Sequence, residues 1–514
     1  MKRRNFIQNL SASMLGLPLT LSGFNLGVLP GRPGIFSAME ESDKVLVLIR
    51  LTGGNDGLNM LLPLDQYDRL YQHRKNVIIP EKSVHKVSDV AGFHPVMGDL
   101  SILHQEGKLG IVQSVGYPDQ NRSHFRSMDI WTSASSSQEK LLSGWLGRYF
   151  ENRFPGFPDA YPNPDHVDPF AVTIGNSVSH TCQGYVGNFS MVVGSPLNLS
   201  PISSNERGDF GEGLYEQNLK FLTTSIEQSN AYSKVIKKAS DQGNNLGPYW
   251  DNNSLAQQLK TVARLISGGI KTKIFIVSQG GYDTHGGQVL QSDNAKGFHA
   301  NLLINLSTAI SQFQYDLELL GIEDRVLGMT FSEFGRRIKS NGSRGTDHGT
   351  AAPLMLFGKC VNPVILGESP EIPAEVDIMD GVAMQYDFRS VYGSVLEDWL
   401  EVGESEIKEL LYDNYTHLPL VTCGKYVEPQ GLKEAFNYPN PFTESTIITF
   451  ESETEEVRIR ILDGSGKVVD QLLNKKLRAG KHRIPYFPRR LPGGNYYFYI
   501  NKASGDITRN MVRL

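Results

Sequence analysis

The chain has 514 residues, of which 39% are hydrophobic and 20% are charged, and this composition excludes disordered, collagen-like and coiled-coil proteins. At about 150 residues per domain, the length predicts two or three domains. The 50 basic and 55 acidic side chains give a net charge of -5, which argues against a nucleic-acid-binding protein, because such proteins carry a basic surface.

The charge is unevenly distributed along the chain. Residues 1–38 carry four basic and no acidic side chains, and residues 437–514 carry 13 basic and 8 acidic ones. Residues 39–436 therefore hold 33 basic and 47 acidic side chains, a net charge of -14. These balances predict three parts with different roles. The three cysteines, Cys182, Cys360 and Cys423, are too few for a disulfide framework and leave at least one thiol unpaired.

Residues 1–38 are predicted to be an export signal. The basic start MKRRNFIQNL leads into a mildly apolar run without charge from Asn5 to Gly31. Proline and several glycines interrupt this run, so we expect no stable transmembrane segment in the mature chain. The pair Arg3-Arg4 before Asn5-Phe6-Ile7 resembles a twin-arginine signal, which implies export of the folded protein by the twin-arginine machinery. A general secretory signal is the alternative.

Residues 437–514 are predicted to form a small β-sandwich after a linker at residues 422–436. Runs such as STIITFES, VRIRILD and NYYFYIN alternate apolar and polar residues between turn residues, as short antiparallel strands do. The motifs Tyr438–Phe442, Asp463–Gly466, Ala479-Gly480 and Pro492–Tyr496 resemble type A carboxyl-terminal sorting domains of the type IX secretion system of Bacteroidetes-type bacteria. The resemblance implies transit through the periplasm and delivery by that machinery to the cell surface or the medium. An ordinary immunoglobulin-like or carbohydrate-binding module is the alternative.

Residues 43–421 are predicted to form an α/β domain with a mostly parallel sheet and helices on both faces. Five apolar runs are typical of buried strands: Val45–Leu51, Gly110–Val115, Lys273–Ser278, Val326–Phe331 and Pro353–Phe357. Amphipathic segments at Leu255–Ile266 and Phe298–Leu320 are expected to be helices. In such a sheet, functional groups collect just beyond the carboxyl ends of the strands.

Side chains able to bind a metal ion lie next to these strands in the sequence. Asp56 follows the first strand, Ser123 and His124 follow the second, Asp283 and His285 the third, Glu333 the fourth, and Asp347 and His348 precede the fifth. Carboxylates and imidazoles bind divalent ions, which activate water or a substrate oxygen at an open position. Each residue also has a simpler interpretation: turn or helix caps, a Glu333–Arg336 salt bridge, or a loop hydroxyl.

Five strings resemble the bacterial domain of unknown function 1501 family over nearly all of residues 43–420. They are LIRLTGGNDGLN, NRSHFRSMDIW, SGWLGRY, GGYDTHGGQ and TFSEFGRR…GTDHGTAAPLMLFG. The family is related to the alkaline phosphatase and sulfatase superfamily, so the resemblance implies a fold of that kind. It also implies a hydroxyl or thiol nucleophile beside one or two divalent ions, with Zn, Mn, Fe, Mg and Ca as candidate identities.

The resemblance also implies roles for individual residues. Asp56 resembles the metal carboxylate after the first strand, and Ser123 resembles the nucleophile, with His124 and Arg126 as its catalytic neighbours. Asp283, His285 and His348 resemble one metal site, and Glu333 resembles an aspartate of a second. Phe334 stands where a histidine of that second site is expected, and Asp347-His348-Gly349 is an alternative match to the same motif. The number of metal ions is therefore left open.

Two functions follow from these residues. The first is a metal-dependent hydrolase or transferase that acts on phosphate or sulfate esters of small molecules or glycans. The second is a non-catalytic surface protein that binds a glycan or a protein and has lost the chemistry. The sequence contains no G-x-S-x-G, H-E-x-x-H, Walker or dinucleotide motif, so other enzyme classes rank low. Convergence of Asp283, His285, Glu333 and His348 favours the first function, and scatter favours the second.

Overall fold

The computed structural model describes residues 20–21, 24–25, 42–194, 213–412, 414–422, 435–438, 446–464, 466–488 and 491–513. The chain divides into two compact units, Met1–Asp43 and Lys44–Leu514. In the first unit, the short strands β1 (Thr20–Leu21) and β2 (Phe24–Asn25) pair antiparallel. The remainder of the predicted export signal, including the arginine pair, lies outside the described residues, as does most of the predicted linker.

A nine-stranded sheet forms the centre of the α/β part. Its order is β15-β7-β14-β11-β3-β10-β8-β9, with β16 beside β7. All its pairings are parallel except those of β14, which runs antiparallel to β11 and β7. The strands are β3 (Val45–Leu51), β7 (Leu109–Gly116), β8 (Ala171–Ile174), β9 (Ser190–Val193), β10 (Ile274–Gln279), β11 (Val326–Ser332), β14 (Ala352–Phe357), β15 (Ile365–Leu366) and β16 (Tyr386–Asp387). The prediction of a mostly parallel sheet is confirmed.

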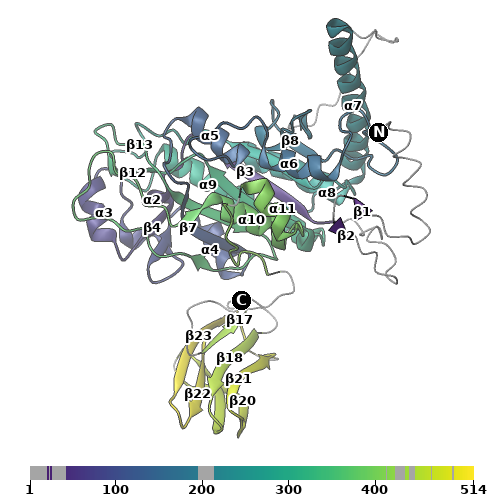
Figure 1. The fold of residues 1–514 in the computed structure, drawn as a ribbon. Coiled ribbons are helices and arrows are strands. Elements are labelled where there is room, and N and C mark those ends of the chain that lie inside the picture. The colour runs from purple at the N-terminus through teal and green to yellow at the C-terminus, as the bar shows by residue number, and fades with distance from the viewer. Residues whose placement is uncertain are drawn as a thin grey trace. The chain divides into compact units, whose positions relative to one another are not determined.

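Helices cover both faces of this sheet (Figure 1). Alternate residues of β3 point to opposite faces, so Val47 and Ile49 join one core and Leu46 and Leu48 join the other. The first core includes residues of α4 (Gly98–Gln105), α7 (Leu214–Gln242), α8 (Ser254–Ser267) and α9 (Phe298–Leu319). The second includes residues of α5 (His124–Ser133), α6 (Trp145–Arg153), α10 (Phe388–Asp398) and α11 (Glu404–Leu411).

Two insertions border the sheet. After β3, the chain forms α2 (Gly57–Met60), β4 (Leu61–Pro63), α3 (Tyr67–Arg74), β5 (His85–Lys86) and β6 (Ala91–Phe93), with the strands in the order β4-β6-β5. Between β11 and β14, β12 (Arg336–Ser340) and β13 (Thr346–His348) pair antiparallel and place Arg336 opposite His348. The chain leaves β11 and enters β14 at the same edge of the sheet, so β14 runs antiparallel to β11.

The strand directions bring five chain segments to one edge of the sheet. β3, β7, β10 and β11 run in the same direction, so their carboxyl ends lie at that edge. β14 runs in the opposite direction and therefore begins there. The segments that carry His124, Asp283, Glu333 and His348 thus meet at a single edge, where sheets of this type place their sites.

The carboxyl-terminal part is a sandwich of two antiparallel sheets, as predicted. One sheet has the order β17-β18-β21 and the other β20-β19-β22-β23, and residues of both form one apolar core. The strands are β17 (Ala435–Tyr438), β18 (Thr446–Ser452), β19 (Glu456–Asp463), β20 (Val468–Lys476), β21 (Gly480–Tyr486), β22 (Gly494–Lys502) and β23 (Ile507–Arg513). The first strand starts two residues earlier than the predicted module.

Cys182 is a buried free thiol, and Cys360 is disulfide-bonded. Among the helices of the described residues, none is both long enough and apolar enough to cross a bilayer.

Candidate metal centre

Four side chains converge at the edge of the sheet. His124, Asp283 and His348 each place a ligand atom within 4.8 Å of the other two. Asp283 Oδ1 lies 3.5 Å from His124 Nε2 and 3.2 Å from His348 Nε2. His285 joins them, because its Nε2 is 3.1 Å from the same oxygen and 2.8 Å from His348 Nε2. We call these four residues the histidine–aspartate cluster.

Two glycines allow the loop after β3 to lie directly against this cluster. Gly53 and Gly54 have φ angles of +122° and +76°, which L-residues with a side chain rarely adopt. A Cβ atom on Gly53 would lie 2.3 Å from the backbone nitrogen of Asp283. A Cβ atom on Gly54 would lie 2.3 Å from the ring of Phe334. The sequence Thr52-Gly53-Gly54 is therefore needed for the close approach of β3, β10 and β11 at their ends.

Each histidine of the cluster is held by a hydrogen bond at Nδ1. His124 Nδ1 lies 2.9 Å from Glu333 Oε1, and His285 Nδ1 lies 2.8 Å from Asp347 Oδ1. His348 Nδ1 lies 2.8 Å from the carbonyl oxygen of Arg122. A carbonyl or an ionised carboxylate only accepts, so each Nδ1 donates and each neutral ring carries its lone pair on Nε2. All three lone pairs are thus on the atoms that converge on Asp283.

This arrangement fits a bound divalent ion. The Nε2 atoms of His285 and His348 are 2.8 Å apart, and both lie beside a carboxylate oxygen. Their lone pairs repel each other and the carboxylate unless a proton or a cation lies among them. In a tetrahedral site with bonds of about 2.0–2.1 Å, the ligand atoms are separated by about 3.3 Å. The three distances to Asp283 Oδ1 and the one between the Nε2 atoms of His285 and His348, at 2.8–3.5 Å, bracket that value. The ligand atoms of His124 and His348 lie within 4.8 Å of each other. Metal-binding histidines also donate their other N–H to a carboxylate or carbonyl, as all three do here.

The protonation states suit metal binding at neutral pH. Burial would raise the pKa of Asp283, but the hydrogen bond and charge of Arg336 and the contacts with His348 and His285 hold that pKa at about 2. Burial lowers the pKa of His348 more than its hydrogen bond to the Arg122 carbonyl raises it. At pH 7 the carboxylate is therefore charged and the His348 ring is neutral, as metal ligands must be.

Glu333 and Asp347 hold histidines rather than joining the four converging atoms. Glu333 is buried, and its Oε1 accepts from the backbone N–H of Gly53 at 2.7 Å as well as from His124. Asp347 accepts from His285 and, at 3.1 Å, from Asn341. The alternative Glu333–Arg336 salt bridge is not formed, because Arg336 donates to Asp283 Oδ1 at 2.7 Å instead.

The other candidate residues lie in three different surroundings. Ser123 is exposed at the N-cap of α5, directly before His124, and its side chain makes no capping hydrogen bond. The Arg126 guanidinium donates to the carbonyls of residues 136, 137 and 139, away from the cluster. Asp56 is fully buried and accepts from Arg74 and Gln288. His124 was predicted as a catalytic neighbour of Ser123, but the structure places it among the converging candidate ligands.

Replacing Asp347 with Asn is expected to weaken divalent metal binding by roughly 10–100-fold, because His285 loses its carboxylate partner. Chelator competition on the purified protein measures this affinity. Glu375→Gln is the matched control, since Glu375 is exposed and the change from acid to amide is the same. Equal affinities of the two variants would show that Asp347 does not orient His285.

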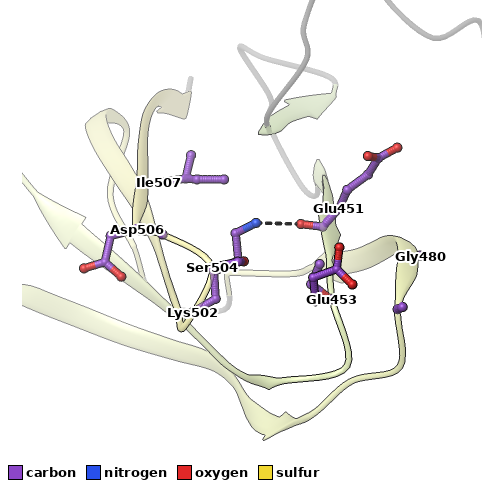
Figure 2. A pocket seen from close by; sticks show the side chains of 10 residues that line it. Glu451, Glu453, Gly480, Lys502, Ser504, Asp506 and Ile507 are labelled. Atoms are coloured by element: carbon purple, nitrogen blue, oxygen red, sulfur yellow. Dashed lines mark hydrogen bonds between the residues drawn. The ribbon is translucent and has the colours of Figure 1, made fainter.

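A hollow lies in the carboxyl-terminal sandwich, away from the candidate residues (Figure 2). It has a volume of about 450 Å³ and is lined by Glu451, Glu453, Lys502, Ser504 and Asp506, among others. Two of its charged groups already have partners: Lys502 donates to the Glu451 carbonyl at 2.9 Å, and Asp506 accepts from Tyr499 and Asn501. Within the described ranges, the histidine–aspartate cluster alone has three or more metal-binding side chains converging closely.

Two family models match the chain. Residues 213–400 match a family described as protein of unknown function (DUF1501), and residues 437–513 match the secretion system C-terminal sorting domain. The first match is shorter than the resemblance seen in the sequence. It includes the five candidate residues that follow β10 and β11, from Asp283 to His348, but not His124. No curated protein matches the chain.

Solved structures are similar to different parts of the chain. A protein in the alkaline phosphatase superfamily from Vibrio parahaemolyticus is 11% identical, covers 85% of this chain and 83% of its own, and has a TM-score of 0.30. The PsFucS1 sulfatase from Pseudoalteromonas sp. is 10% identical, covers 86% and 83%, and has a TM-score of 0.33. PorZ, a type IX secretion component of Porphyromonas gingivalis, is 14% identical with a TM-score of 0.13; the match spans 16% of this chain and only 11% of that one.

Proposed function

We propose that this protein is a metal-dependent hydrolase of phosphate or sulfate esters. Residues 213–400 match the DUF1501 family, and residues 437–513 match the type IX sorting domain, which directs export to the cell surface or medium. The observation that supports the metal centre is the convergence of three Nε2 atoms on Asp283 Oδ1. Three imidazoles with one carboxylate favour zinc or iron over magnesium or calcium.

The charge of the cluster supports an anionic substrate. Asp283, Glu333 and Asp347 are acidic, and Arg336 and Arg337 each lie against one of these carboxylates. The net charge of these five side chains is negative, and a bound divalent ion would make it positive, so the metal-loaded site would attract anions. The side chains of the cluster are 22–49% exposed, which leaves the site accessible to a substrate.

The chain's own residues would share the chemistry as follows. The cluster would hold a divalent ion, which when bound would supply Lewis-acid polarisation of the ester oxygen. Ser123, the exposed N-cap residue of α5, would attack the phosphorus or sulfur atom and lose its proton to solvent. The bond to the ester's alcohol oxygen would break, the alcohol would leave with a proton from solvent, and water would then release phosphate or sulfate from Ser123. Glu333, Asp347 and the Arg122 carbonyl keep the three imidazoles fixed during this step.

The proposal is tested with the metal-loaded, exported protein and a panel of aryl phosphates and aryl sulfates. We expect hydrolysis of at least one class, loss of hydrolysis after chelation, and recovery when zinc or iron is restored. Absence of hydrolysis of every ester by protein with a confirmed metal content would favour the non-catalytic binding protein, the function for which Phe334 is the motivating residue.

Ser123→Ala is expected to lower ester hydrolysis by roughly 10³-fold or more while metal content stays unchanged, because the variant lacks the attacking oxygen but keeps the ligands. Steady-state rates and metal analysis of the same preparation provide the two measurements. Ser225→Ala, on α7, removes a hydroxyl that bonds only its own helix and serves as the control. An unchanged rate in Ser123→Ala would exclude Ser123 as the nucleophile.

A further inference from the structure

The surroundings of the cluster bear on how many metal ions it binds, and this inference rests on the proposed function. The resemblance is compatible with one ion or two, and a second ion would be expected near Asp56, Glu333 and the position of Phe334. Two features of the structure concern these positions, an ion pair at Asp56 and an aromatic ring at Phe334. A third, a buried arginine, concerns Asp283 in the cluster itself.

Asp56 already has a cation. Its two oxygens lie 3.0 and 3.1 Å from Arg74 Nη1, and Oδ2 accepts from Gln288 Nε2 at 2.6 Å. The side chains of Asp56 and Arg74 are both fully buried, so this pair is shielded from solvent. Arg74 is held in place by the carbonyls of Ile338 and Arg337, at 2.9 and 2.7 Å. A metal ion at Asp56 would have to displace a buried guanidinium with its own network.

Phe334 and Glu333 leave too few donors for another ion beside His124. The Phe334 ring is buried, with its centroid 5.0 Å from that of His124 and 4.7 Å from that of His348. Oε1 of Glu333 is occupied by His124 and the Gly53 N–H. Its Oε2 is buried without a hydrogen-bond partner, and a single carboxylate oxygen is not a ligand set for a divalent ion.

Arg336 places a fixed positive charge against Asp283. It is buried, and its guanidinium donates to the carbonyls of Gly53, Gly54, Tyr282 and Thr346 and to Asp283 Oδ1. These bonds tie together the loops after β3 and β10 and strand β13. A carboxylate oxygen has two lone pairs, so Asp283 Oδ1 can accept a hydrogen bond from Arg336 and still offer one lone pair to an ion held among the three imidazoles.

We propose that the centre binds a single divalent ion, at the histidine–aspartate cluster, and that Arg74 and Arg336 occupy the places where a second ion would otherwise balance Asp56 and Asp283. The centre would then contain one metal ion and the positive charges of two buried arginines, Arg74 and Arg336. Asp56 is a structural residue in this account, not a ligand.

The test is the metal content of the full exported chain and of two variants with the same chemical change, Asp56→Asn and Asp283→Asn, after loading with excess zinc or iron and removal of the free ion. We expect one ion per chain for the native protein, one for Asp56→Asn and none for Asp283→Asn. Two ions in the native protein, or loss of an ion in Asp56→Asn, would overturn this inference and leave the proposed function intact. No ion in the native protein would overturn both. If Asp56→Asn does not fold, the native count still decides.

Discussion

Replacing Asp283 with Asn is expected to weaken divalent metal binding by more than roughly 100-fold and to abolish ester hydrolysis. A loss of up to roughly 100-fold is typical for a residue that only hydrogen-bonds to a metal ligand, and a ligand itself should cost more. Asp283 is the one anionic side chain on which three imidazole nitrogens converge, at 3.1–3.5 Å from Oδ1. An amide has no charge to offer the ion, and its NH₂ group would face either Arg336 or the imidazoles. Chelator competition and metal analysis measure the first effect, and the ester panel measures the second.

Asp251→Asn is the control for this experiment, because Asp251 is exposed and the chemical change is the same. Its metal affinity and rate should match those of the native protein. If Asp283→Asn retained native affinity, the cluster would be a hydrogen-bonded surface group and the proposed centre would be wrong.

Replacing Arg74 with Met is expected to lower the free energy of unfolding by about 3–5 kcal/mol, because the variant leaves the Asp56 carboxylate buried without its cation. Burial would raise the pKa of Asp56, and the charges of Arg74 and His299 and the hydrogen bond from Gln288 lower it below its usual value. The loss of Arg74 removes the largest of these compensations. Denaturant unfolding of the metal-free protein measures the change.

Lys75→Met provides the matched comparison, since Lys75 is the next residue and is exposed. Its free energy of unfolding should stay within about 0.5 kcal/mol of the native value. A similarly small effect of Arg74→Met would mean that the pair carries little of the stability at this edge of the sheet. An effect that appears only in the metal-loaded protein would instead point to Asp56 as a ligand.

Much of the fold could be predicted because buried strands and long helices have strong local patterns. The runs at Val45–Leu51 and Val326–Phe331 became β3 and β11 almost unchanged, and the segment at Phe298–Leu320 became α9. Strands β8 and β9 were not predicted, since runs of four residues are too short for a clear pattern. The antiparallel direction of β14 was not predicted either, because the apolar pattern of a buried strand does not depend on the direction in which it runs.

The sequence could predict the edge of the sheet where the candidate residues meet, but not which of them contact one another. Candidate residues at strand ends meet at one edge because parallel strands end together. The sequence could not show that Asp56 faces Arg74, because that contact joins the loop after β3 to the end of α3. Nor could it show that His124 turns towards Asp283, because the Nδ1 partner that orients it, Glu333, comes from a distant strand.

We propose that a single divalent ion is held by His124, Asp283, His285 and His348. Anomalous diffraction from crystals of the metal-loaded protein, collected on either side of the absorption edge of zinc or iron, would locate this ion. We predict a single anomalous peak about 2.0–2.2 Å from the three Nε2 atoms and an Asp283 oxygen. A peak elsewhere, or none at this cluster in protein that contains the metal, would contradict the claim.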